Sequence, residues 1–298
     1  MIKLICGDCL EVLKTLPDES VDAVITDPPY GYLSHKLDAA FDPVEFFQQA
    51  YRVLSDDGML IFFGRGVVLA RWMCICEDLR FNFKEELVWR KQRASSPLSM
   101  LGRRHELAMV FSKGSGKIRK VKIDYIQSRL AAGNIDALVM ALSRIKSSLV
   151  NIKTWEQFKE WLEGAYLKQV IPKHGITGYA GTRDRDRGRI TYQSLTDGAR
   201  LESVISVNTE HYKYEHPTQK PVQLMEYLID LCTDKGMTVL DPFMGSGSTG
   251  IAAKNLGRDF IGIEISPKYL EIAQQRIDNA QPPAQAELWK EDNAINLR

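Results

Sequence analysis

Residues 238–250 read TVLDPFMGSGSTG, which is an apolar run, a glycine-containing turn and the beginning of a helix. Gly245, Gly247 and Gly250 match the G-x-G-x-x-G pattern in the strand–turn–helix setting that this pattern requires. Glu264 ends the next strand-like run, where an acid can accept hydrogen bonds from ribose hydroxyls. The stretch therefore predicts a Rossmann-like sheet that holds an adenosine-containing cofactor.

Strand-like and helix-like segments alternate in two separate blocks of the chain. In the first block we expect strands at 2–6, 21–25, 59–63, 81–89 and 106–111, a turn at 56–58, and helices at 10–16, 43–54 and 67–79. In the second block we expect strands at 238–240 and 260–263 and helices at 219–232, 249–256 and 266–279, the last capped by Ser266. This alternation predicts an α/β fold with a doubly wound, mostly parallel Rossmann-like sheet.

The alternation stops between the two blocks, where the sequence predicts a largely helical insert. We place the main domain at 1–111 and 212–298 and the insert at 112–211. An aromatic stripe at 155–161 has helical spacing, which favours a helix core over a base-stacking surface.

Basic residues gather in and beside the insert, at 90–104, at 113–122 and in an Arg-rich segment at 182–189. Clustered Lys and Arg indicate a nucleic-acid-binding face. Asp alternates with Arg in the last segment, which weakens its basic field.

The composition is that of an ordinary soluble protein, and the formal net charge of +1 over 298 residues favours no particular partner. The sequence shows neither a signal-like apolar region nor a membrane-length apolar run, which predicts a cytoplasmic location. Cys6 and Cys9 have the spacing of half a zinc site. Because no second Cys or His pair accompanies them, we expect free thiols and no metal.

A second stretch, Asp27-Pro28-Pro29-Tyr30, follows the strand-like run at 21–25. In open α/β sheets, ligands bind at the carboxyl ends of the strands. The prolines stiffen the backbone and donate no hydrogen bond, so the segment offers carboxylate and carbonyl acceptors beside an aromatic ring. Such a cluster suits a planar group that bears an NH2, such as a nucleobase. A rigid loop with a helix-capping Asp explains these four residues equally well.

The residues before the three glycines help to distinguish between two cofactors. An NAD enzyme shares the glycines, but Asp241 would add negative charge beside a pyrophosphate. S-adenosylmethionine has a zwitterionic amino-acid tail, whose ammonium a carboxylate can hold. The Asp241-Pro242-Phe243 segment therefore favours S-adenosylmethionine over NAD.

Three segments together resemble the amino DNA methyltransferases, which methylate the exocyclic amine of adenine or cytosine. They are the tetrapeptide at 27–30, the glycine loop at 241–250 and His-Pro-Thr-Gln-Lys-Pro at 216–221. Arg104-His105-Glu106 and Gly7-Asp8 are also similar to that family. The tetrapeptide precedes the cofactor loop, as in the permuted beta group of the family.

The resemblance covers about 1–113 and 212–278, and it implies that the main domain is a catalytic methyltransferase domain. The insert at 112–211 lies outside the resemblance, as expected of a target-recognition region that varies with the DNA sequence read. Asp at position 27, where relatives can carry Ser, favours adenine over cytosine.

The resemblance also implies roles for single residues. Asp27 and the Pro28 carbonyl would hold the target NH2, and Tyr30 would stack on the base, with Pro29 completing the catalytic segment. The implied cofactor-binding residues are Asp8, which would meet the adenine; Thr218 and Lys220, beside the cofactor; Asp241 and Pro242, which precede the glycines; Phe243, Gly245 and Gly247, around the methionine part; and Glu264, on the ribose. The residues expected to contact DNA are His35, Lys36, Lys91, Arg93, Arg103, Arg104, Arg183, Arg185 and Arg187.

The function implied is site-specific methyl transfer from S-adenosylmethionine to N6 of an adenine flipped out of double-stranded DNA. Transfer to cytosine N4 is the alternative within the family, and RNA is a less favoured substrate. An NAD-dependent oxidoreductase or a catalytically silent DNA-binding protein are the alternatives from other classes. The sequence leaves open whether the chain forms a homodimer or works with a companion restriction endonuclease.

Overall fold

A computed structural model of the chain describes residues 1–31, 41–91, 101–119, 121–123, 125–126, 129, 134–149, 154, 157, 191–192, 195–196, 199–207 and 219–280. The chain divides into two compact units, the first formed by 1–119 and 203–298 and the second by 120–202. The sequence placed these boundaries at 111 and 212. They shift because the backbone at Arg119 donates to the Leu231 carbonyl (2.8 Å) and because residues 204–206 join the large sheet of the first unit.

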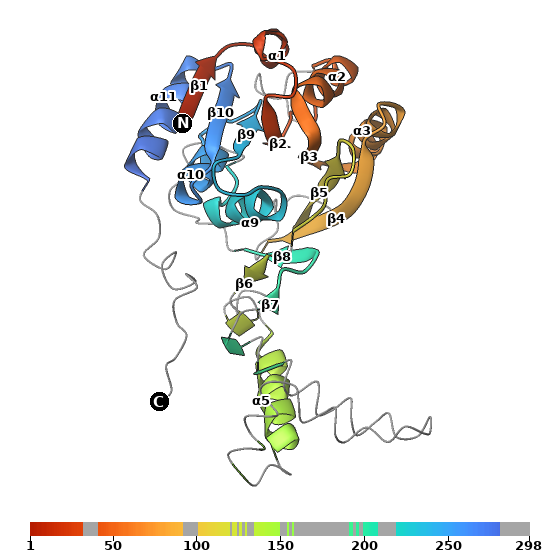
Figure 1. Cartoon of the computed structure of the whole chain (residues 1–298), viewed down its shortest axis with the longest axis vertical. Helices are drawn as coiled ribbons and strands as arrows, with labels where there is room; N and C mark the ends of the chain where they lie inside the picture. The colour runs from red at the N-terminus through yellow and green to blue at the C-terminus, as the bar shows by residue number, and fades with distance from the viewer. Residues whose placement is uncertain are drawn as a thin grey trace. The chain divides into compact units, whose positions relative to one another are not determined.

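The first unit is built on an eight-stranded sheet (Figure 1). In spatial order the strands are β1 (Ile2–Cys6), β10 (Asp259–Glu264), β9 (Thr238–Asp241), β2 (Val21–Thr26), β3 (Leu54–Gly64), β5 (His105–Ser112), β4 (Asn82–Arg90) and β8 (Val204–Ser206). Every pairing is parallel except those that β5 makes with β3 and β4. The expected α/β, mostly parallel sheet is confirmed, and the two sequence blocks meet where β9 pairs with β2 and where β10 pairs with β1.

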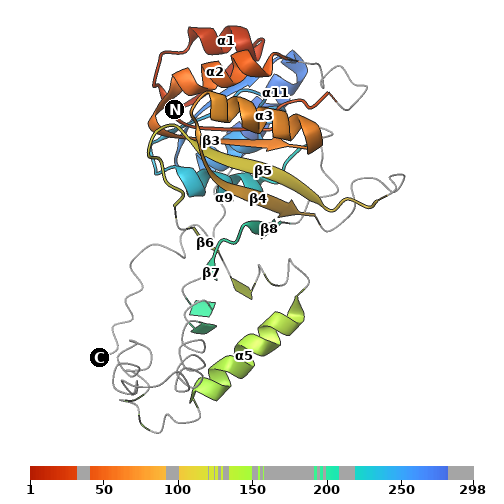
Figure 2. The same ribbon diagram turned by 90° about the vertical axis from the view of Figure 1, so that its right-hand side faces the viewer.

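Helices cover both faces of this sheet (Figures 1 and 2). One face carries α1 (Cys9–Thr15), α2 (Pro43–Val53) and α3 (Gly66–Asp78), and the other carries α9 (Val222–Cys232), α10 (Ser248–Asn255) and α11 (Pro267–Asn279). Asp8 and Asp42 cap α1 and α2, since each carboxylate accepts from the amide two residues on at 2.9 Å. Ser266 occupies the N-cap position of α11 as expected, but its side chain makes no capping hydrogen bond.

One cluster of the hydrophobic core lies under α1, α2 and α3. Phe46 and Phe47 of α2, Phe62 of β3 and Trp72 of α3 meet there with their rings in edge or tilted contact. Each is at most 4% exposed. This packing fixes the carboxyl ends of β2 and β3, where the candidate site lies.

The turn expected at 56–58 is wrong, because those residues lie inside β3. Val21 pairs with Leu54 and Ala23 with Met59, so β3 accommodates extra residues in an irregularity opposite β2. The polar residues Asp56 and Asp57 are exposed there. The Asp and Gly residues that suggested a chain reversal therefore mark a bulged part of the strand.

The second unit contains the helix α5 (Ile135–Leu149) and a short antiparallel pair, β6 (Lys122–Ile123) with β7 (Ala199–Arg200). Arg129 pairs with Glu202 at 2.7 Å within it. Helix α5 agrees with the helical pattern expected from 124 to 171. The aromatic stripe at 155–161 falls outside the described residues except for Gln157, and the Arg-rich segment at 182–189 lies entirely outside them.

Two further expectations concern membrane spans and thiols. Within the part of the chain that the structure describes, no helix is long and apolar enough to cross a membrane. All five cysteines are free thiols, and burial raises the pKa of Cys9 to about 12.

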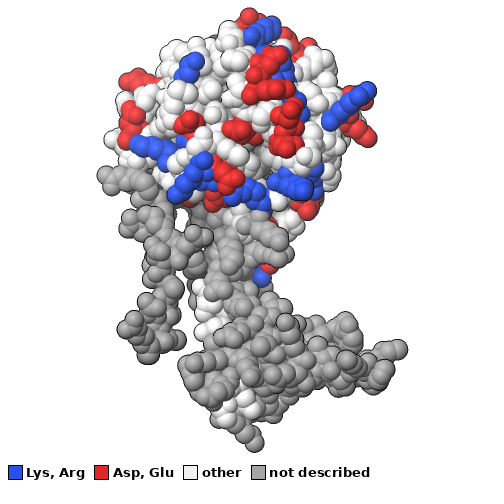
Figure 3. Space-filling model, viewed as in Figure 1, with Lys and Arg blue, Asp and Glu red and all other residues white. Residues whose placement is uncertain are grey.

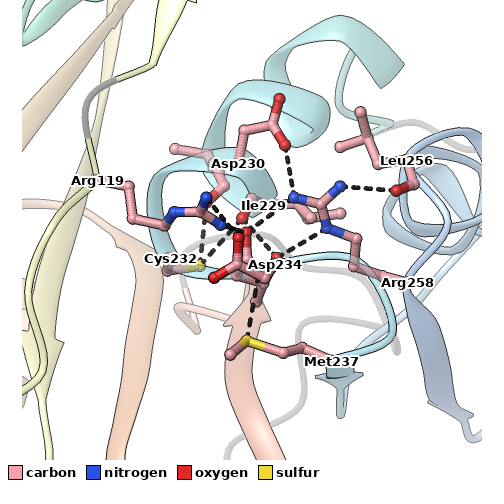
Figure 4. A network of polar contacts seen from close by, with 10 residues as sticks. Arg119, Ile229, Asp230, Cys232, Asp234, Met237, Leu256 and Arg258 are labelled. Atoms are coloured by element: carbon pink, nitrogen blue, oxygen red, sulfur yellow. Dashed lines mark hydrogen bonds and ion pairs between the residues drawn. The ribbon is translucent and has the colours of Figure 1, made fainter. Parts of the chain in front are cut away.

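Arg258, which immediately precedes β10, joins the end of α9 to the end of α10 (Figure 4). Its guanidinium donates to the Thr233 carbonyl (2.8 Å), the Leu256 carbonyl (2.6 Å) and the Asp230 carboxylate (2.7 Å). Only 8% of Arg258 is exposed. Arg119 donates to the same Thr233 carbonyl, so this network also anchors the chain where it leaves the first unit.

We expect Arg258→Met to lower the free energy of unfolding by about 3 kcal/mol, because a partly buried carboxylate and two carbonyls lose their charged donor. Arg119→Met is the matched control. The Arg119 side chain is 41% exposed and its partner Asp234 is 62% exposed, so that change should cost about 1 kcal/mol or less. Urea denaturation of both variants measures the two losses in free energy of unfolding. Equal losses would contradict the larger contribution expected of Arg258.

Candidate active site

The glycine loop turns sharply between β9 and α10. Gly247 has a φ of 82°, and a Cβ at this position would lie 2.9 Å from the Cβ of Ala273 in α11. Both the left-handed backbone and the close approach therefore require glycine. The turn brings the Gly245 amide to the Glu264 carboxylate at the end of β10 (2.9 Å).

Glu264 is oriented by backbone donors on both sides. Its Oε2 accepts from Gly245 and its Oε1 accepts from the Ser266 amide at 2.8 Å. Burial raises the pKa of Glu264, and these amide donors oppose that rise. Each carboxylate oxygen keeps a further lone pair, so Glu264 can also accept from a pair of ligand hydroxyls.

Asp241 connects the cofactor strand to the strand of the tetrapeptide. Its Oδ1 accepts from the Thr26 hydroxyl (2.8 Å) and the Phe243 amide (3.1 Å), and its Oδ2 accepts from the Thr249 hydroxyl (2.6 Å). Only 3% of Asp241 is exposed. Burial raises the pKa of Asp241 to about 6, although all three donors favour the charged form.

Asp27 follows β2 directly and has a partner on each carboxylate oxygen. The Tyr30 hydroxyl donates to Oδ1 and the Lys220 ammonium donates to Oδ2. Burial and the charge of Asp27 raise the pKa of Tyr30 well above its usual value, so Tyr30 is a neutral donor. The carboxylate is thus held firmly at the carboxyl end of the sheet.

Two adjacent residues of the His-Pro-Thr-Gln-Lys-Pro motif at 216–221, Gln219 and Lys220, contact the two parts of the site. The side-chain Oε1 of Gln219 accepts from the Ser246 hydroxyl of the glycine loop at 3.0 Å, while Lys220 contacts Asp27. The next residue, Pro221, occupies the N-cap position of α9. The beginning of α9 therefore bridges the cofactor loop and the tetrapeptide.

A buried chain of charges extends beyond Lys220. Its Nζ also lies 3.3 Å from Oε2 of Glu106 in β5, and the other oxygen of Glu106 pairs with Lys91. Burial alone would raise the pKa of Glu106, but the ammonium groups of Lys220 and Lys91 lower it to about 2. Burial alone would lower the pKa of Lys220, and Asp27 and Glu106 reverse this effect and raise it.

An aromatic wall joins the tetrapeptide to the glycine loop. The Tyr30 ring lies 5.9 Å from Trp72, Trp72 lies 5.8 Å from Phe41, and Phe41 lies 5.2 Å from Phe243, measured between ring centroids. Sequence reasoning missed Phe41 and Trp72, because nothing distinguishes them locally from other core aromatics.

The family model described as DNA methylase, N6_N4_Mtase, matches residues 21–275. This chain belongs to that family.

Individual relatives agree with the family match. The type II methyltransferase M.HpaI of Haemophilus parainfluenzae is 26% identical over 297 residues, which cover 93% of this methylase and 74% of M.HpaI. The crystal structure of the M1.HpyAVI–SAM complex has a TM-score of 0.56 at 23% identity and covers 93% of this chain and 100% of that one. The cytosine-N4-specific PvuII DNA methyltransferase has a TM-score of 0.57 at 16% identity, covering 97% and 91%.

The structure brings most of the expected site residues of the methylase to one edge of the sheet. Asp27 and Tyr30 lie beside Lys220, and β2, β9 and β10 are neighbours. Asp8, at the end of β1, uses Oδ1 to cap α1. Thr218 and the residues His35, Lys36, Arg93, Arg183, Arg185 and Arg187 lie outside the described residues.

The structure describes three of the residues expected to contact DNA, namely Lys91, Arg103 and Arg104. Arg104 is exposed and Arg103 is half-buried. Lys91 pairs with Glu106 and lies 4.9 Å from the centre of the Trp89 ring, so part of its charge is already balanced within the protein. Acidic and basic residues are interspersed over the described part of the face shown in Figure 3. The DNA contacts stay predictions.

The Asp241 carboxyl gives the methylase a testable pH dependence. Its folded pKa of about 6 lies above the ordinary value of 3.8, so the folded state binds its proton more tightly. This tighter proton binding stabilises the folded state by roughly 3 kcal/mol below about pH 4, and the stabilisation is lost as the pH rises through about 6. Asp241→Asn should remove this component.

Denaturant unfolding of wild type and Asp241→Asn between pH 4 and 7 measures the effect. We expect the variant to gain stability relative to wild type as the pH rises through this range. A constant difference between the two proteins across the range would contradict the raised pKa.

Proposed function

We propose that this DNA methylase transfers a methyl group from S-adenosylmethionine to N6 of adenine in double-stranded DNA. One observation carries the proposal: Asp27 and the glycine loop follow adjacent parallel strands, β2 and β9, which Thr26 and Asp241 join at 2.8 Å. A base held at Asp27 and a cofactor held by the loop would then face each other in one site.

Several features of the loop suit S-adenosylmethionine. Glu264 has lone pairs to spare for the ribose hydroxyls, and the Gly245–Gly247 turn presents backbone beside Phe243 for the methionine part. Ser248 Oγ is buried without a hydrogen-bond partner among the described residues, which leaves it a donor for a ligand. M1.HpyAVI, a structural neighbour, is a complex with this cofactor.

The remaining cofactor assignments follow from the same geometry. Asp241 already has three internal donors, so we assign it to holding Pro242, Phe243 and the loop in place, rather than to direct contact with the cofactor ammonium. Asp8 keeps Oδ2 for the cofactor adenine while Oδ1 caps α1. Thr218 and Lys220 were both expected beside the cofactor, and Lys220 is considered further below.

Bound S-adenosylmethionine supplies a methyl group that its sulfonium charge already activates. The protein's part is to make the amine a better nucleophile and to position it. The Asp27 carboxylate and the Pro28 carbonyl would accept from the two amine hydrogens, which draws the nitrogen lone pair out of the ring. Pro28 and Pro29 keep these acceptors fixed, so little reorganisation accompanies the transfer.

The base must leave the duplex to reach Asp27, at a cost of a few kcal/mol that stacking on an aromatic ring offsets in part. Tyr30 offers that ring, because Trp72 and the hydrogen bond to Asp27 hold it in place. The insert, with Arg103, Arg104 and the basic residues of the second unit, would read the target sequence.

Adenine is favoured over cytosine by the carboxylate at position 27. The PvuII enzyme, cytosine-N4-specific, has a comparable fold, which makes cytosine N4 the second candidate. A homodimer and a companion restriction endonuclease stay predictions.

Asp27→Ala should lower the methyl-transfer rate by about 100-fold or more, because it removes the acceptor that activates the amine. Its dissociation constant for S-adenosylmethionine should stay within about twofold of wild type. Single-turnover transfer of a labelled methyl group to DNA gives the rate, and digestion of the product to nucleosides identifies the methylated base. Wild type should yield N6-methyladenine.

Asp22→Ala is the matched control, because Asp22 lies toward the opposite end of β2 and accepts from the Thr238 amide (2.8 Å), away from Asp27. It should retain the wild-type rate. If the product contained N4-methylcytosine instead, the target base would be cytosine and not adenine. Full activity of Asp27→Ala would refute the catalytic role, and an inactive wild type that still binds DNA would support a silent DNA-binding protein.

A further inference from the structure

Lys220 lies at the catalytic carboxylate in the described structure, although its motif predicted a place beside the cofactor. Its ammonium pairs with Oδ2 of Asp27, and its Nζ is 4.7 Å from the centre of the Phe63 ring. Only 9% of the Lys220 side chain is exposed. An ammonium in such a dry setting binds a carboxylate strongly, because water cannot replace the partner.

This arrangement opposes the function proposed for Asp27. A carboxylate that donates electron density to an ammonium pulls less on the hydrogens of an incoming amine. Oδ1 is also engaged, by the Tyr30 hydroxyl. For Asp27 to act as the full acceptor of the target NH2, one of these two donors has to withdraw.

Glu106 offers Lys220 a second partner. Its Oε2 lies 3.3 Å from the Lys220 Nζ and, among the residues that the structure describes, is a buried oxygen without a hydrogen bond. Its Oε1 is held by Lys91, so the carboxylate stays in place when Lys220 moves. A small displacement of the ammonium toward Oε2 would release Asp27 without stranding a buried charge.

We propose that Lys220 is a positioning residue that moves from Asp27 to Glu106 when the target amine enters, and so acts on the catalytic carboxylate instead of on the cofactor. The inference rests on the proposed role of Asp27. Lys220 holds the Asp27 carboxylate in place in the free enzyme. Glu106 then takes the ammonium and leaves Oδ2 to the amine. The charged and titratable groups around the pair are Tyr30, Lys91, Arg103, Glu106 and Asp241.

Glu106→Gln is the sharpest variant, because it keeps the shape of the side chain and removes the charge that attracts Lys220. With DNA and S-adenosylmethionine both saturating, we expect its single-turnover rate to fall by about tenfold or more at every pH. The dissociation constant for S-adenosylmethionine, measured calorimetrically without DNA, should change by no more than about twofold.

Lys220→Met should also slow the transfer step, because Asp27 loses the ammonium that holds its Oδ2 in place. With DNA and S-adenosylmethionine both saturating, its single-turnover rate should fall by about tenfold or more while its dissociation constant for S-adenosylmethionine changes by no more than about twofold, and Lys220→Arg should restore the rate toward wild type. Lys113→Met is the matched control. Lys113 is also largely buried and paired with Glu19 at 3.2 Å, but it contacts the Leu54 carbonyl at the other end of β3.

Three outcomes would overturn the proposal. One is a wild-type transfer rate in Glu106→Gln. Another is a Lys220→Met protein whose transfer rate at saturation and affinity for S-adenosylmethionine both match those of wild type. The third is a Lys220→Met protein that binds S-adenosylmethionine about tenfold more weakly while keeping its rate at saturation, which would return Lys220 to the cofactor. A wild-type chain that methylates no DNA would instead refute the proposed function, and the inference with it.

Discussion

The hydrogen bond from the Thr26 hydroxyl to the Asp241 carboxylate (2.8 Å) joins two strands whose sequences are 215 residues apart. The rest of the site depends on the pairing of β2 with β9, which this hydrogen bond stabilises. Because β2 and β9 are parallel neighbours, their carboxyl ends lie at one edge of the sheet, and the segments that follow them face the same space. The tetrapeptide and the glycine loop thus lie at one edge of the sheet, despite their distance along the chain.

The charges around Asp27 form a second constraint. Four ionised groups, on Asp27, Lys220, Glu106 and Lys91, alternate in sign through a largely buried region. Apolar residues of similar volume would often be as stable or more stable in such a place, since each ion loses its hydration. An arrangement of this kind is therefore better explained by chemistry at Asp27 than by stability of the fold.

Much of the fold could be predicted because its signals are local. Apolar runs, helix caps and the turn at Gly247 are set by residues adjacent in sequence, and the structure bears out the sheet and most of the helices around them. The partners of Asp241, Lys220 and Glu106 could not be predicted, because they come from segments that only the folded sheet brings together. The irregularity at 56–58 was missed for the same reason: without the pairing to β2, the Asp-Asp-Gly sequence is typical of a turn.

The structure of the chain bound to S-adenosylmethionine tests most directly whether the two segments form one site. The account predicts that the ribose hydroxyls contact Glu264 and that the sulfonium methyl points across the boundary between β9 and β2 toward Asp27. A cofactor bound elsewhere, or one bound at the glycine loop with its methyl group directed away from Asp27, would contradict it.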